Sequence, residues 1–151
     1  MAEVDEVMLK VQRILTGALK LSVTLRDDHF LVGFSDASTT VMIRVLGWNQ
    51  DDAGNGETAV VLSAPILIDA PASSELFEWV ARNGGSRLFG HVEVSDGNAD
   101  GLVHLTMSHT LLGDYIDSKE LEHGLYSVLS SADEWDDELK EKFGGRRFSE
   151  D

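Results

Sequence analysis

The chain contains no cysteine and only two prolines. Without thiols it can form no disulfide, no thiolate metal site and no cysteine nucleophile. Basic residues are also scarce, because 12 lysines and arginines stand against 27 acidic residues, which gives a formal net charge of −15. Nucleic acids and anionic membranes are bound through basic surfaces, so this charge argues against both as main partners. The missing cysteines fit a reducing cytosol.

Long hydrophobic runs are missing as well. No stretch approaches the 18 apolar residues that a membrane-spanning helix needs. The first ten residues carry Glu3, Asp5 and Glu6, where a signal peptide would carry positive charge. We therefore expect a soluble protein of the cytoplasm.

The composition is that of one folded domain. A hydrophobic content of 42% is too high for a disordered acidic chain. At 151 residues the chain fills one domain of ordinary size, and no low-complexity linker divides it. We expect a single domain over residues 1–145 and a polar C-terminal tail over residues 146–151.

The first half of the chain changes its hydrophobic period from helix to strand. Apolar residues recur at spacings of three and four over residues 3–19, which predicts an amphipathic helix. A period of two then predicts strands over residues 30–34, 41–48 and 58–68, joined by polar turns. Pro65 removes a backbone donor from the third strand, so we expect that strand to be an edge, or to be bent or bulged there.

The second half repeats helix, two strands and helix. Ser73 and Ser74 open a helix that Gly84 and Gly85 end. Strands are predicted over residues 88–95 and 102–109, with the hairpin turn at residues 96–99. Asp117 caps a last helix, whose apolar residues recur at spacings of four and three. The order α-β-β-β-α-β-β-α predicts an α+β fold with a five-stranded, mainly antiparallel sheet flanked by helices.

Two histidines of the second hairpin are candidate metal ligands. If the turn lies at residues 96–99, His91 faces His104 across the hairpin, and Glu93 could supply a third ligand. We favour the simpler interpretation of a half-exposed polar sheet face, because two imidazoles without further ligands are weak grounds for a metal site. No nucleophile motif, phosphate-binding loop or dinucleotide fingerprint is present. We therefore expect neither an enzyme nor a cofactor.

The last helix concentrates the negative charge. Residues 114–142 hold ten acidic residues and three lysines, and six of the acids lie in the C-terminal half of the helix. A solvated face that keeps the protein soluble explains this simply. The alternative is a docking surface for a basic peptide, in which Trp135 beside Asp136 and Asp137 supplies an aromatic anchor with a charged rim.

The arrangement resembles the YbjN-like group and related peptide-binding chaperone-like domains of bacteria, which share the fold of class I type III secretion chaperones. The residues that carry the resemblance are Trp79–Asn83, Leu88–Gly90, Leu111–Asp114, Ala132–Leu139 and Phe143–Gly145. The resemblance implies a compact acidic domain, often dimeric, that binds a segment of another protein without a cofactor. The His91 and His104 pair is not a feature of this group.

The sequence thus predicts a non-enzymatic domain that recognises a partner protein or peptide, with an acidic rim that selects basic partners. Trp135, Asp136, Asp137 and Phe143 are the predicted binding residues. If the chain is a homodimer, as the resemblance implies, we expect the second helix and the fourth strand at the interface, with Trp79 as its anchor. The alternatives are an immunity or inhibitor protein that neutralises a basic partner, or a small metal protein or enzyme built on the two histidines.

Overall fold

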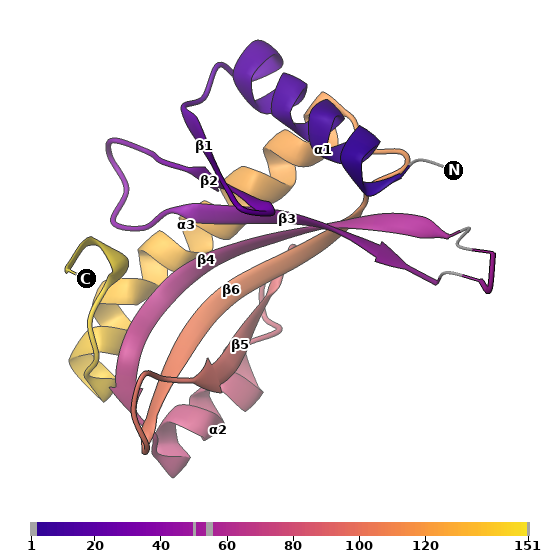
Figure 1. Ribbon diagram of the computed structural model, residues 1–151. Coiled ribbons are helices and arrows are strands. Elements are labelled where there is room, and N and C mark those ends of the chain that lie inside the picture. The colour runs from indigo at the N-terminus through magenta and orange to yellow at the C-terminus, as the bar shows by residue number, and fades with distance from the viewer. Residues whose placement is uncertain (1–2, 50, 54–55, 151) are drawn as a thin grey trace.

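The computed structural model describes residues 3–49, 51–53 and 56–150. Its elements follow one another as α1 (Val4–Arg13), a π-helical turn (Ile14–Ala18), β1 (Val23–Arg26), β2 (His29–Val32), β3 (Val41–Trp48), β4 (Glu57–Pro71), α2 (Ser74–Asn83), β5 (His91–Asp96), β6 (Leu102–Leu112), α3 (Ser118–Phe143) and a 3₁₀ turn (Phe148–Glu150). Figure 1 shows the strands as one twisted sheet crossed by α3.

The sheet has six antiparallel strands in the order β1-β2-β3-β4-β6-β5. The predicted α+β fold is confirmed, but the predicted number of five strands is wrong by one. The missed strand, β1, is only four residues long, and only Val23 is partly buried in it. It turns into β2 through Asp27, whose φ of 52° suits a tight turn, so that Arg26 pairs with His29. Val23 and Leu25 alternate with Thr24 and Arg26, so the sequence carried a strand signal, but one that spans only four residues.

The core lies between the sheet and the helices. Alternate residues of β3 and β4 are buried and face the helices, as the period of a strand requires. The predicted apolar residues of the last helix are confirmed as core residues of α3, each at most 8% exposed: Leu121, Leu125, Val128, Ala132, Trp135 and Leu139. Burying each large apolar side chain contributes roughly 1.5–3 kcal/mol, so α3 is the main stabilising cover of the sheet.

Local signals placed the helix starts and the strand irregularity correctly. The Ser73 hydroxyl accepts a hydrogen bond from Leu76 N at 3.1 Å, and the Asp117 carboxylate accepts one from Glu120 N at 2.8 Å. The register between β4 and β6 shifts on both sides of Leu67, directly after Pro65. β4 lies between β3 and β6, so the alternative of an edge strand is wrong, whereas the expected bend or bulge at Pro65 is confirmed.

The polar residues after α3 pack back onto the fold. Arg146 forms an isolated bridge with Ile68, and its guanidinium lies 2.9 Å from the Asp69 carboxylate. Ser149 N donates to the Ser38 carbonyl at 3.2 Å. The segment is polar, as predicted, and is tied to the sheet; the domain boundary at residue 145 stays a prediction.

Candidate partner-binding groove

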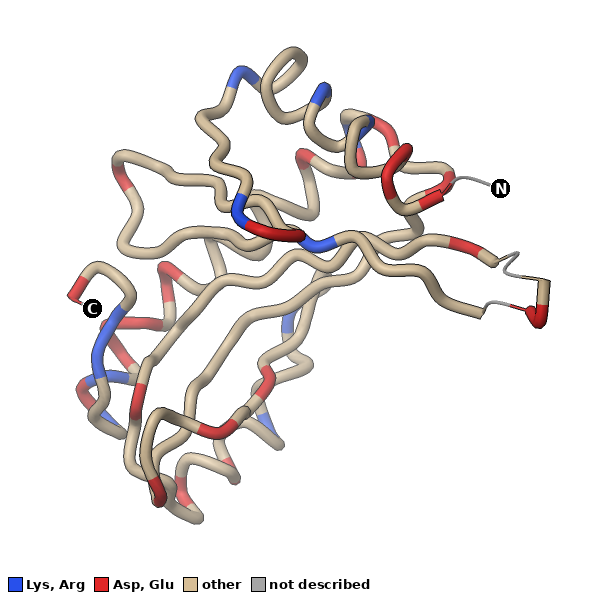
Figure 2. Tube along the Cα trace, in the orientation of Figure 1, with Lys and Arg blue, Asp and Glu red and all other residues tan. Residues whose placement is uncertain are grey.

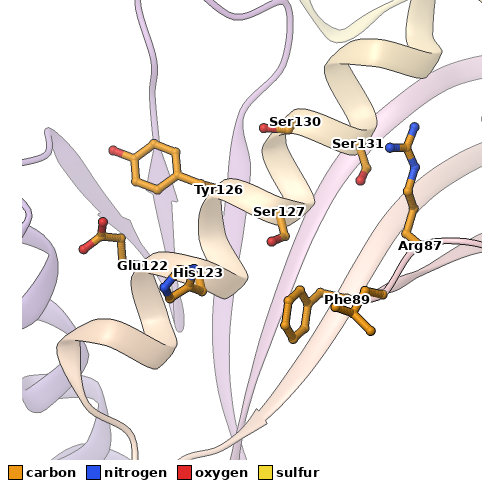
Figure 3. A pocket seen from close by; sticks show the side chains of 9 residues that line it. Arg87, Phe89, Glu122, His123, Tyr126, Ser127, Ser130 and Ser131 are labelled. Atoms are coloured by element: carbon orange, nitrogen blue, oxygen red, sulfur yellow. The ribbon is translucent and has the colours of Figure 1, made fainter.

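A groove runs between α3 and the segment of residues 84–90 that links α2 to β5. It consists of two neighbouring cavities of about 500 and 390 Å³, which share Phe89 and His123. The larger cavity, drawn in Figure 3, is lined by Arg87, Leu88, Phe89, Glu122, His123, Tyr126, Ser127, Ser130 and Ser131. The smaller cavity is lined by Phe89, His109, Leu111, Asp117, Lys119, Glu120, His123 and Gly124.

Glycines hold the linking segment in place above α3. Gly84 ends α2, and its carbonyl accepts a hydrogen bond from Val92 N at 2.9 Å. Gly90 has a φ of 88°, and a Cβ there would lie 2.8 Å from the Ser108 carbonyl oxygen. A side chain at this position would be both strained and in collision with β6, so the glycine fixes where the segment crosses into β5.

Exposed apolar side chains line the groove. Leu88 is 89% exposed, and Phe89 and Tyr126 are 42% and 40% exposed. The Phe89 ring packs edge to face on His109 with the ring centroids 5.8 Å apart. Figure 3 shows Ser127 and Ser131 projecting from α3 on the side of Phe89 and Arg87. Clustered apolar side chains with polar neighbours are typical of sites that bind another molecule.

The charge around the smaller cavity is mostly negative. Asp117 and Glu120 lie in its wall beside Lys119. Burial, and next the proximity of His91, lower the pKa of His109, so this imidazole is neutral at pH 7. Residues 88–118 contain five acidic residues and no lysine or arginine. The apolar lining therefore lies within a surface that favours cationic ligands.

Trp135 and Trp79, which the sequence assigned to two different surfaces, contact each other. Their rings meet edge to face with centroids 5.2 Å apart, and Trp135 is only 8% exposed. The Arg87 guanidinium lies 4.5 Å above the Trp135 ring and 2.8 Å from the Glu134 carboxylate. This aromatic pair supports Arg87 at one end of the groove. Phe143 is partly buried against the core.

Several acidic residues of α3 bond to other residues of the chain. Figure 2 shows basic and acidic positions close together near the C-terminus. Asp136 is 1% exposed and is bonded to the Ser38 hydroxyl. Asp137 is exposed and pairs with Arg147. Burial raises the pKa of Asp136, whereas hydrogen bonds from Ser38 lower the pKa of Asp133. The binding roles predicted for Asp136 and Asp137 stay predictions, and only Asp137 presents its carboxylate to solvent.

The predicted contact between His91 and His104 is wrong. His91 pairs with Ser108, and His104 pairs with Ser95, because the loop between Asp96 and Leu102 is longer than the assumed turn. His91 bonds to Glu93 at 2.8 Å, whereas His104 Nδ1 accepts from Asp69 N at 3.1 Å. Among residues 3–49, 51–53 and 56–150, no three histidine or acidic side chains are grouped to hold a metal ion.

Sequence reasoning missed Leu88, Phe89 and Tyr126 as site residues. It placed Leu88 and Phe89 in a strand, whereas β5 begins at His91. The glycines at positions 84, 85 and 90, which bracket this segment, are the sequence signal of an irregular link between α2 and β5.

In the described part of the chain, no helix has the length and apolarity to cross a membrane.

Comparison with known proteins identifies relatives of the whole fold. Residues 5–151 match the family model described as "T3SS (YopN, CesT) and YbjN peptide-binding chaperone 1". A solved structure, described as that of YbjN, a putative transcription regulator from E. coli, superposes with a TM-score of 0.58. It is 12% identical in sequence, and the match covers 89% of this chain and 93% of that chain. No curated protein matches.

Proposed function

We propose that this chain, which belongs to the family of T3SS and YbjN peptide-binding chaperones, binds a segment of a partner protein in the groove beside α3 and catalyses no reaction. The observation that carries the proposal is the set of exposed apolar side chains, Leu88, Phe89 and Tyr126, that meet along this groove. Burying them against a partner would supply the main binding free energy, at about 25 cal/mol per Å² of apolar surface.

The charge of the groove defines the partner segment further. Apolar side chains of the partner segment would pack on Phe89 and Leu111, and its basic side chains would lie near Asp117 and Glu120. Exposed ion pairs contribute at most about 1 kcal/mol each, so the acids would select and orient the segment more than they would strengthen binding.

In this proposal, two of the binding residues predicted from the sequence stabilise the structure around the groove. The Trp135 ring packs against the Arg87 guanidinium, and Asp136 bonds to Ser38 and so connects α3 to the loop that contains Ser38. Asp137 and Phe143 lie beyond the groove, where a longer partner segment would reach them.

We also propose a homodimer through α2, with the exposed part of Trp79 as anchor and Phe77, 46% exposed, beside it. We place the protein in the cytoplasm.

The groove is tested with matched apolar substitutions. An array of 12-residue peptides would be probed with the native chain, with Leu88→Ser/Phe89→Ser, and with the control Leu9→Ser/Leu25→Ser. The control residues are 47% and 55% exposed and line no part of the groove. We expect the native chain and the control to bind the same peptides, rich in apolar and basic residues, and the groove variant to lose them. Equal loss in both variants would refute the groove as the site.

An inhibitor of a basic protein is the second candidate function. The net charge of −15 favours it, because such inhibitors bind through broad acidic surfaces. The two functions differ in whether the bound partner is folded. An inhibitor would bind a folded basic protein, whereas the proposed groove would bind an extended segment of a partner even when that segment is an isolated peptide.

A further inference from the structure

The larger cavity of the groove contains an oriented cation, the guanidinium of Arg87. It lies 4.5 Å above the Trp135 ring, and its Nη2 lies 2.8 Å from the Glu134 carboxylate. Stacking on the indole fixes the plane of the guanidinium. Within the residues that the structure describes, Nε and Nη1 of Arg87 form no hydrogen bond. Arg87 therefore keeps donors for a second anion.

Serine hydroxyls of α3 face the same space. Ser127 and Ser131 lie one helical turn apart, and Figure 3 shows both on the side of α3 toward Arg87. A helical hydroxyl can donate to the carbonyl four residues before it, as Thr16 does to Gln12 at 2.8 Å. The hydroxyls of Ser127 and Ser131 make no such bond, nor any bond to another described residue. Both hydroxyls are therefore available to a ligand.

Ser131 distinguishes this arrangement from a solvated surface. The residue is only 6% exposed, yet it lines the cavity and its hydroxyl has no partner in the described part of the chain. Withdrawing a hydroxyl from water costs free energy unless a new hydrogen bond replaces the water. A ligand oxygen between Ser131 and Arg87 would satisfy the hydroxyl and the free edge of the guanidinium together.

The charges of the groove are separated along α3. Glu122 lines the same cavity as Arg87, but it precedes Ser131 by nine residues, which is about 13 Å along a helix. Glu120, in the wall of the smaller cavity, precedes Ser131 by about 16 Å. Figure 3 shows Glu122 and Arg87 at opposite ends of the cavity. The groove is thus acidic beside the N-terminal part of α3 and basic at Arg87.

We propose that the Arg87 end of the groove binds the carboxylate of an aspartate or glutamate side chain in the partner segment, with Ser127 and Ser131 as further donors. This inference rests on the proposed function and specifies the segment, whose basic residue would lie near Glu120. An extended segment rises about 3.3 Å per residue, so the two charges would be about five positions apart. The preferred segment is bipolar, with apolar residues on Phe89 between a basic and an acidic residue.

A side-chain carboxylate suits this end of the groove better than other anions. A planar carboxylate matches the two parallel N–H bonds that a guanidinium edge offers. Glu134 already lies beside Arg87 and the net charge is −15, so the second negative charge of a phosphoryl group would be repelled. Because Ser131 is nearly buried, a carboxylate on a side-chain stem can reach it while the backbone of the segment stays outside.

The test uses a peptide that contains a single carboxylate. The labelled peptide Gly-Lys-Thr-Leu-Thr-Leu-Asp-Gly, blocked at both ends, places lysine and aspartate about five positions apart. We expect replacement of its aspartate by asparagine to weaken binding to the native chain about tenfold, by fluorescence anisotropy, and to make little difference with Arg87→Gln. Arg82→Gln is the matched control, because this exposed arginine pairs with Glu78 and lines neither cavity. It should discriminate between the two peptides like the native chain.

Two further measurements do not depend on replacing Arg87. Ser131→Ala removes only the nearly buried hydroxyl, so we expect it to weaken binding of the aspartate peptide roughly threefold or more and to leave that of the asparagine peptide unchanged. In NMR spectra of the native chain, the aspartate peptide should shift the Nε–H signal of Arg87, and the asparagine peptide should not.

The outcomes separate this carboxylate site from the groove itself. Equal affinity of the native chain for the two peptides, or array ligands without an acidic residue, would overturn the site and leave the groove intact. A phosphoserine peptide that binds more tightly than the aspartate peptide would assign the site to a phosphoryl group and overturn the proposal. An asparagine peptide that regains full affinity with a free C-terminal carboxylate would overturn it as well. If neither these peptides nor the array bind the native chain, the proposed function fails instead.

Discussion

Asp136 bonds to the hydroxyl of Ser38, although the two residues lie 98 positions apart in the chain. The same hydroxyl is bonded to Asp133, which also accepts from Ser38 N at 2.9 Å. One hydroxyl hydrogen cannot serve two carboxyl groups at once. Both hydrogen bonds to the hydroxyl are satisfied when Asp136 is protonated at Oδ2 and donates to Ser38, which in turn donates to Asp133; the buried Oδ1 of Asp136 has no hydrogen-bond partner in the described chain. The cluster ties the β2–β3 loop to α3.

Asp136→Asn is predicted to stabilise the fold at neutral pH. Burial raises the pKa of Asp136, so the folded state keeps this proton after the unfolded chain has released it. The stability that the group contributes is therefore present below its ordinary pKa and is lost as the pH rises through its higher folded value. We expect a gain of about 1 kcal/mol at pH 7 and none near pH 3, measured by urea unfolding at both values.

The matched control for this prediction is Asp137→Asn, on the exposed side of the same turn. Its pair with Arg147 is at the surface, so we expect its removal to change stability by less than ~0.5 kcal/mol at pH 7. An Asp136→Asn variant that is as stable as the native chain at pH 7, or less stable, would contradict a protonated Asp136.

Asp69 is predicted to titrate far below an ordinary aspartate. Hydrogen bonds from the backbone and then the side chain of Asn98, with a smaller contribution from Arg146, lower the pKa of Asp69 to about 2. The stability linked to this carboxylate is present above its unfolded pKa and is lost as the pH falls toward 2. Carboxyl-carbon NMR should show a midpoint near this value, and Asn98→Ala and Arg146→Ala should each raise it, because each removes a side-chain donor to the carboxylate. A midpoint near 4 in the native chain would refute this network.

The sequence predicted those parts of the fold whose signals are local. The spacing of Leu121, Leu125 and Val128 is set by the helix itself, so it identified the buried side of α3 without knowledge of the sheet. The hairpin register depended on how the loop around Gly97 and Gly101 closes, which residue types alone do not fix. The groove could not be predicted either, because it depends on the path that residues 84–90 take from α2 to β5 beside α3.

The contact between Trp79 and Trp135 is predicted to couple α2 to α3. Edge-to-face rings contribute about 0.5–1.5 kcal/mol beyond their buried area, so a double-mutant cycle with Trp79→Phe and Trp135→Phe should give a coupling free energy in this range.

For the proposed dimer, light scattering should give twice the chain mass for the native protein and a lower mass for Trp79→Ala. The chain mass of 16.5 kDa at high concentration would end the dimer proposal.

Gly90→Ala is predicted to damage the groove while the core stays folded. The positive φ of Gly90 and its approach to the Ser108 carbonyl leave no room for a methyl group, so residues 84–90 must shift. We expect a loss of roughly 1–3 kcal/mol in unfolding free energy and a larger loss of peptide binding, because Phe89 directly precedes the strained residue. Gly85→Ala is the control, since a Cβ there meets nothing within 4 Å and its φ is not in the left-handed region. If Gly90→Ala were destabilised but bound peptides like the native chain, the placement of Phe89 would not matter for binding, and the site would have to lie elsewhere.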